Sequence, residues 1–247
     1  MNKGLKLEIE EKAVLFRNEN GYSADAPIQL SSLLLKKNVI TVFKPLSDKL
    51  SGMAIKAPGN IRFMLINRKH IIGRQHFTIG HELYHLFVQE NFSAQKCNAG
   101  LFDSQTDIEE NKADYFAACL LLPENGIKQL VPQEERPKKN LISDTTIFKI
   151  QQYYRLSVNA VIYRLVELDF VDNTYYDKYK NEKKAIARKL GYDMGLFEPR
   201  EEDKYIGDYG IIANELFKNK KISESFYLEL LNAINIDPFA ASDNGKK

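Results

Sequence analysis

The sequence lacks tryptophan and has two cysteines and four histidines among 247 residues. Cys97 and Cys119 do not have the paired spacing of a thiolate zinc site, and we expect Cys119 to be a small, reduced core residue. No segment approaches the roughly 18 consecutive apolar residues of a membrane-spanning helix, and residues 1–12 carry no apolar signal core. We therefore expect a cytoplasmic protein that does not associate with membranes.

A strong charge of one sign is also missing. The 35 basic and 33 acidic residues leave a formal net charge of +2, which is weak for a dedicated nucleic-acid-binding protein. Hydrophobic residues make up 44% of the chain, enough to bury one substantial core and a smaller one. No internal repeat is evident, so the sequence does not indicate a repeat array.

Two of the four histidines lie in one pentapeptide, H-E-L-Y-H at residues 81–85. In this composition chance produces an H-E-x-x-H pattern with a probability on the order of half a percent. Residues four apart lie one turn above each other on a helix, so the imidazoles of His81 and His85 can reach one metal ion. The pattern therefore indicates a metal site, with the carboxylate of Glu82 beside it.

The residues around the motif favour a helix. Between Arg74 and Glu90 there is no proline, and Gly80 is the one weak helix former. Apolar residues recur at the three-and-four spacing of a buried stripe. They are Ile79, Leu83, Leu86 and Phe87. Two imidazoles beside such a stripe, with a nearby carboxylate, suit zinc.

Two ligands are too few, because catalytic zinc normally takes three from the protein. His76 lies too close upstream in the same run to fold back, and His70 lies in an expected loop. The longer pattern H-E-x-x-H-x-x-G-x-x-H is absent, since Val88 and Asn91 occupy its later positions. The third ligand is therefore expected among the acidic residues downstream.

Residues 108–123 are predicted to form a second helix that ends at a proline. Glu110 and Asp114 are four apart and lie on one face of it. Glu110 can then be the third ligand, while Asp114 accepts the ring N–H of one histidine and fixes its tautomer. Glu109 would face about 100° away and is the weaker candidate.

Two segments together resemble the ImmA/IrrE family of metallopeptidases. They are R-Q-H-F-T-I-G-H-E-L-Y-H-L-F at 74–87 and E-N-K-A-D-Y-F-A-A-C-L-L-L-P at 110–123. The family carries R-Q-x-F-T-x-x-H-E-x-x-H followed by E-x-x-A-x-x-F-A-x-x-L-L-x-P, and the resemblance spans residues 5–170. Tyr84 stands where a small residue is frequent and His76 where Arg or Asn is common, but neither position binds the metal.

The resemblance implies a cytoplasmic zinc peptidase. One Zn²⁺, or alternatively Mn²⁺, would be held by His81, His85 and Glu110, with Glu82 as the general base. The implied substrate is a helix-turn-helix transcriptional repressor encoded in a stress operon, a mobile element or a toxin–antitoxin-like pair. The alternative is a DNA-binding or repressor-sequestering regulator whose metal site is not catalytic. His70 and Tyr84 are candidates for a second oxyanion donor, and the sequence does not choose between them.

The rest of the chain predicts an α+β fold, with a zincin-like core and a helical carboxy-terminal extension. Two helices and then three strands are expected before the zinc helix, the strands forming a small antiparallel or mixed sheet. The ranges are 6–18 and 27–36 for the helices and 39–43, 52–56 and 61–66 for the strands. The last strands are either an edge for an extended peptide or a plain structural hairpin. Residues 91–107 are expected to form a surface loop that covers substrate or merely links the two metal helices.

The segment 131–140 combines two prolines with several charges and is the best internal boundary. We predict a zincin-like metallopeptidase domain over 1–135, a helix-turn-helix-like segment over 141–172 and a helical extension over 173–247.

Within the middle segment, two helical patterns at 146–154 and 158–168 are joined by a short turn with Ser157 as an N-cap. If residues 144–172 bound DNA, Arg155, Asn159 and Arg164 would be the contacts. Nearby acidic residues cancel the local charge, so packing against the core or holding the substrate protein is favoured. Further on, a basic helix over 179–190, an acidic linker over 198–203 and helices over 206–218 and 223–234 are expected.

Overall fold

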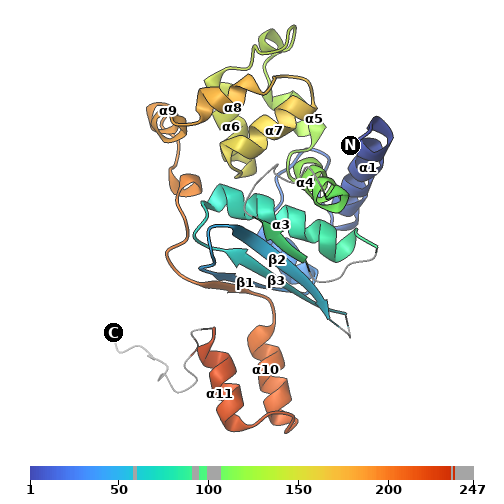
Figure 1. Ribbon diagram of the computed structural model, residues 1–247, viewed down its shortest axis with the longest axis vertical. Coiled ribbons are helices and arrows are strands. Elements are labelled where there is room, and N and C mark those ends of the chain that lie inside the picture. Colours follow the sequence, from blue (N-terminus) through green and yellow to red (C-terminus); the bar gives the residue numbers. More distant parts are fainter. Residues whose placement is uncertain (58–59, 91–94, 99–106, 235, 237–247) are drawn as a thin grey trace.

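The protein has an α+β fold, as predicted (Figure 1). The computed structural model describes residues 1–57, 60–90, 95–98, 107–234 and 236. In it a long helix lies across a mixed sheet, and further helices cover the side of that helix away from the sheet. A helical hairpin near the carboxy terminus lies beyond the other side of the sheet.

The amino-terminal half contains the elements predicted for it. They are α1 (Lys3–Glu19), α2 (Leu30–Lys36), β1 (Val39–Lys44), β2 (Leu50–Ala57), β3 (Ile61–Asn67), α3 (Ile72–Phe87), β4 (Gln95–Asn98) and α4 (Ile108–Leu121). The one element not expected is β4, which falls inside the predicted surface loop over 91–107. That prediction is wrong for β4, and the remainder of the loop up to residue 106 lies outside the described residues.

The carboxy-terminal half is mostly helical. Its elements are α5 (Glu124–Leu130), η2 (Gln133–Glu135), α6 (Asp144–Tyr154), α7 (Val158–Glu167), α8 (Thr174–Tyr179), α9 (Lys183–Lys189), η3 (Gly195–Phe197), β5 (Lys204–Ile206), α10 (Tyr209–Lys218) and α11 (Glu224–Asn232). The predicted helix pair with Ser157 as N-cap is confirmed, because the Ser157 hydroxyl accepts from the amide of Ala160 at 3.2 Å. The basic helix predicted over 179–190 is instead interrupted after Tyr179.

The sheet has the strand order β4-β2-β3-β1-β5. β1 and β3 are parallel, and the other neighbours are antiparallel, so the sheet is mixed. β3 lies between β2 and β1, and β2 pairs on its outer side with β4. Of the two alternatives for the last strands, the structure has the plain hairpin, since β2 and β3 are consecutive and pair antiparallel. The edge strands of the described sheet are β4 and β5.

A glycine in β2 lets α3 pack closely on the sheet. A Cβ added at Gly52 would lie 2.7 Å from the Thr78 side chain and 3.1 Å from Oε1 of Glu82. Real Cβ atoms do not approach within 3.0 Å, so a side chain at this position would force the Thr78 side chain or α3 to move. The strand and the motif helix are thus fitted to each other at the functional site.

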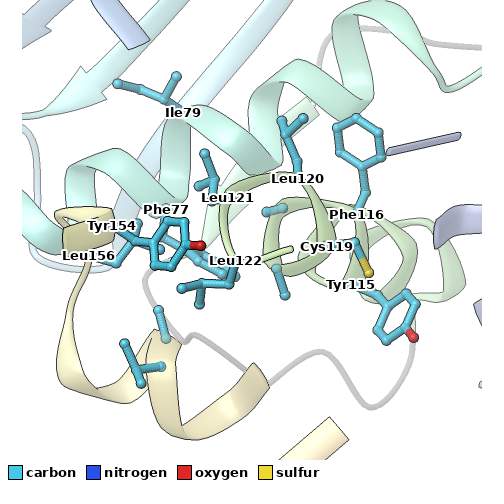
Figure 2. Packing of buried hydrophobic residues seen from close by; sticks show 14 of the residues in the cluster. Phe77, Ile79, Tyr115, Phe116, Cys119, Leu120, Leu121, Leu122, Tyr154 and Leu156 are labelled. Carbon is cyan, nitrogen blue, oxygen red and sulfur yellow. The ribbon is translucent and has the colours of Figure 1, made fainter. Parts of the chain in front are cut away.

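α4 lies at the centre of the helical layer. Every residue from Ala113 to Leu121 is buried, and Figure 2 shows its side chains pointing in several directions, with Leu121, Phe116 and Tyr115 on different sides. A helix that is buried all round is part of the core. The helix expected to supply the third ligand therefore has little freedom to move.

Two buried arginines donate hydrogen bonds to backbone carbonyls at the carboxy end of α4. Arg17 of α1 donates to the carbonyl of Leu120, and Arg164 of α7 donates through Nε to the carbonyl of Leu122 at 3.1 Å. These last carbonyls have no partner within a helix, so the arginines satisfy them. Arg164 is 1% exposed and also pairs with Glu10 at 2.8 Å. Arg164 is therefore too buried to be one of the three contacts expected if residues 144–172 bound DNA.

The chain returns to the core after α9. The carbonyl of Glu198 accepts from the amide of Ile72 at 2.9 Å, at the start of α3. Asp203 accepts from Arg68 Nε at 2.6 Å, and β5 then pairs with β1.

The division of the chain into three units, with boundaries at 135, 141 and 173, stays a prediction. Among the described residues, the helices are too short or too polar to span a bilayer.

Gly73, the second residue of α3, is where this helix meets α7. A Cβ there would lie 2.6 to 2.7 Å from backbone atoms of Leu156 and Ser157. We expect Gly73→Ala to lower the free energy of unfolding by about 1–3 kcal/mol, because backbone cannot give way as a flexible side chain does. Thermal unfolding followed by circular dichroism measures this.

Gly4→Ala is the matched control, because Gly4 is also the second residue of its helix. Its added Cβ would meet a single atom at an ordinary 3.7 Å. This variant should stay within about 1 kcal/mol of the wild type. Equal effects of the two substitutions would show that the close approach of α3 and α7 is unimportant for stability.

Candidate metal centre

α3 carries three buried polar side chains of the motif. His81, Glu82 and His85 are 4%, 1% and 1% exposed. The Nε2 atoms of the two histidines lie 3.0 Å apart, as expected for positions one turn apart on one face. Polar groups are rarely buried to this extent without a purpose, since their desolvation costs free energy unless it is compensated.

Glu110 of α4 completes the cluster. Its Oε2 lies 3.2 Å from His81 Nε2 and its Oε1 lies 3.4 Å from His85 Nε2. One donor atom from each residue falls within 4.8 Å of the others. Two imidazole nitrogens and a carboxylate oxygen are the donor set of a three-ligand zinc site. The residues therefore fit a metal ion, although this geometry does not identify the element.

Each histidine is oriented by a partner at its other ring nitrogen. His81 Nδ1 lies 2.8 Å from Asp114 Oδ1, and His85 Nδ1 lies 2.6 Å from Gln89 Oε1. When Nδ1 carries the proton and donates it, the Nε2 lone pair is directed at the shared centre. The sequence indicated the role of Asp114 but not that of Gln89, which lies four residues after His85, just beyond the end of α3.

The protonation of His85 suits this arrangement. Burial, followed by the neighbouring His81, lowers the pKa of the His85 imidazole. A lowered pKa keeps the ring neutral near pH 7, and the neutral ring is the form that binds a metal ion.

Glu109, the weaker candidate, is directed elsewhere. It accepts from the hydroxyl of Tyr84 at 2.9 Å and pairs with Lys112 at 2.6 Å. Burial opposes ionisation, but these hydrogen bonds hold the pKa of Glu109 below its usual value. Burial and the contact with Glu109 raise the pKa of Tyr84. The Tyr84 hydroxyl is thus bonded to Glu109, and His70 lines a different hollow.

An H-E-x-x-H helix on a mixed sheet, joined by a glutamate from a second core helix, is an arrangement typical of metallopeptidases. Residues 36–166, more than half of the chain, match the family model described as the IrrE N-terminal-like domain of peptidase family M78, so the chain belongs to the ImmA/IrrE family of metallopeptidases. A search of curated proteins gives no significant match.

Asp114→Asn tests the orientation of His81. The amide is similar in size but carries no negative charge to stabilise the donated proton, so we expect zinc affinity to fall about 10- to 100-fold with the fold intact. Competition with a chromophoric chelator measures the affinity, and circular dichroism checks the fold. Unchanged affinity would mean that the 2.8 Å contact with His81 does not prepare this histidine for the metal.

Proposed function

We propose that this protein is a zinc-dependent endopeptidase that cuts one partner protein at a specific site. The observation that carries the proposal is the convergence of His81, His85 and Glu110 within 4.8 Å, next to the buried carboxylate of Glu82. The cluster stands on two core helices, and catalytic groups on rigid elements are held to the tolerances that chemistry requires.

The residues of the chain have separate tasks in this reaction. Zinc, held by the two histidines and Glu110, would supply Lewis acidity to the scissile carbonyl and lower the pKa of water to about 7. Glu82 would take the proton of the attacking water and transfer it to the leaving amine, which is general base and then general acid catalysis. Asp114 and Gln89 would keep both imidazoles in the orientation that binds the metal.

The proposed substrate is a helix-turn-helix transcriptional repressor, and its cleavage would control a stress, mobile-element or toxin–antitoxin-like operon. Membership of the ImmA/IrrE family supports this proposal. The rival regulator that binds DNA through 144–172 is disfavoured by the burial of Arg164, which removes one of three predicted contacts. Of the other two, Arg155 is exposed, while the amide oxygen of Asn159 accepts from Lys183 at 2.7 Å.

The test uses the helix-turn-helix protein encoded nearest this gene. It is incubated with the zinc-loaded protein, or with the protein and excess chelator, and examined by intact-mass spectrometry. Two discrete fragments that form only with zinc would establish a site-specific protease and locate the bond. An uncut partner that binds tightly would instead favour sequestration, and salt-dependent binding to duplex DNA would favour the regulator.

A further inference from the structure

A polar cavity lies near the amino end of α3, the helix that carries two of the three clustered donors. It is a cavity of about 360 Å³ where the amino end of α3 meets the amino end of α7. Its polar lining consists of Lys69, His70, Arg74, Ser157, Asn159 and Lys183, and its apolar lining of Ile71, Val158 and Phe197. The cavity is large enough for one side chain or a small organic anion.

The lining carries more basic than acidic side chains. It includes two lysines and an arginine, and no carboxylate is found among the described lining residues. Lys183 donates to the neutral amide of Asn159 at 2.7 Å, and burial lowers its pKa. Burial, followed by Arg74, lowers the pKa of His70 as well. Positive groups gathered in a partly desolvated hollow are stabilised when an anion joins them.

The first amides of α7 add to this preference. Ser157 caps the amide of Ala160 with its hydroxyl, and within the described part of the chain the amides of Val158 and Asn159 have no acceptor. Both residues line the cavity. Unbonded amides at a helix start attract anions, and these two residues line the same cavity as the basic side chains.

Arg74, which lines the cavity, lies on the same face of α3 as His81. Arg74 precedes His81 by seven residues, which is close to two helical turns and about 10 Å along the axis. Thr78 lies between them on that face, and Arg74 Nη2 reaches Ser51 Oγ of β2 at 3.1 Å. Extended polypeptide advances about 3.3 Å per residue, so about three residues span the distance from the metal centre.

We propose that this cavity binds an oxyanion, a carboxylate or a phosphate, and that its natural source is an acidic side chain of the substrate about three residues from the cleaved bond. The choice of source rests on the proposed function, while anion binding does not. Lys183, Lys69 and the amino end of α7 would then select the substrate sequence, and the metal centre would cut it.

Anion binding is tested by NMR of the full-length, ¹⁵N-labelled protein titrated with glutarate and with inorganic phosphate. The amides of Val158 and Asn159 should shift and saturate. Lys183→Gln should weaken binding about tenfold, as expected for one charged hydrogen bond, and Lys69→Gln should weaken it as well. Lys189→Gln is the matched control, because Lys189 is exposed on the same helix. Shifts that never saturate, or equal losses in the Lys183 and Lys189 variants, would overturn the proposal.

A second arm identifies the source of the anion. The zinc-loaded wild type and Lys183→Gln each digest a peptide library, and the fragments are sequenced by mass spectrometry. A preference for Asp or Glu near the third residue from the cut, lost in Lys183→Gln, would support the substrate source. Cleavage without this preference, with anion binding intact, would assign the cavity to a free anion. If no peptide is cut, the proposed function is weakened while the amide titration still decides on the cavity.

Discussion

Glu82→Gln is expected to retain zinc and to lose nearly all cleavage of the partner protein. The substitution keeps the size of the side chain, so its fit against Gly52 is preserved, but it removes the group that accepts a proton. General base catalysis contributes about 10²- to 10⁴-fold, so the rate should fall by about a thousandfold. Because Glu82 is not one of the three clustered donors, zinc stoichiometry should be unchanged.

The measurement pairs a cleavage time course with zinc analysis of the same sample. Glu90→Gln is the control, since Glu90 is exposed and follows the same helix. It should behave as the wild type. A Glu82 variant that cuts at the normal rate would remove this residue from the mechanism, and a variant that loses zinc would show that Glu82 is a ligand.

Glu110→Gln should lower zinc affinity by at least about 100-fold. Loss of a second-shell partner typically costs 10- to 100-fold, and loss of the carboxylate ligand should cost no less. The neighbouring Glu109→Gln changes the charge equally, one residue away, but Glu109 pairs with Lys112 and Tyr84. Its zinc affinity should be nearly normal.

Chelator competition on both variants compares the two glutamates directly, and thermal unfolding in the absence of metal checks that the apoproteins are equally folded. If Glu109→Gln lost zinc and Glu110→Gln retained it, the ligand assignment would be reversed. Such a result would also mean that α4 turns relative to α3 when the metal binds.

Helix geometry alone predicts which residues of the cluster share a face. The spacing between His81 and His85 and between Glu110 and Asp114 puts each pair on one face, and the turn of about 100° per residue separates Glu110 from Glu109. What the sequence did not reveal was which histidine meets Asp114, because that depends on how α4 lies against α3. This packing is set by apolar contacts such as Gly80 with Leu121 and Ala117.

The sheet was less predictable than the helices. β4 has the sequence Q-K-C-N and β5 has K-Y-I; neither is long enough to show an alternating pattern. Each pairs through main-chain hydrogen bonds with a longer strand, β4 with β2 and β5 with β1. The sequence also did not show that β3 is an internal strand, because this position depends on its parallel pairing with β1. Strand order is a property of the whole chain and not of a local segment.

Because Glu198 contacts the start of α3, some contacts of the core can form only after most of the chain has been synthesised. The amide of Ile72 at the start of α3 can bond to the carbonyl of Glu198 only after residue 198 has been synthesised. In the same way, β1 can pair with β5 only after β5 has left the ribosome. Contacts of such sequence separation form slowly, because a long loop must close first. During synthesis the motif helix can therefore dock on β2 and β3 while its first turn is still incomplete. A nascent chain stalled before residue 198 would contain every proposed metal ligand and yet lack the hydrogen bond to the amide of Ile72, the first residue of the helix that carries two of them.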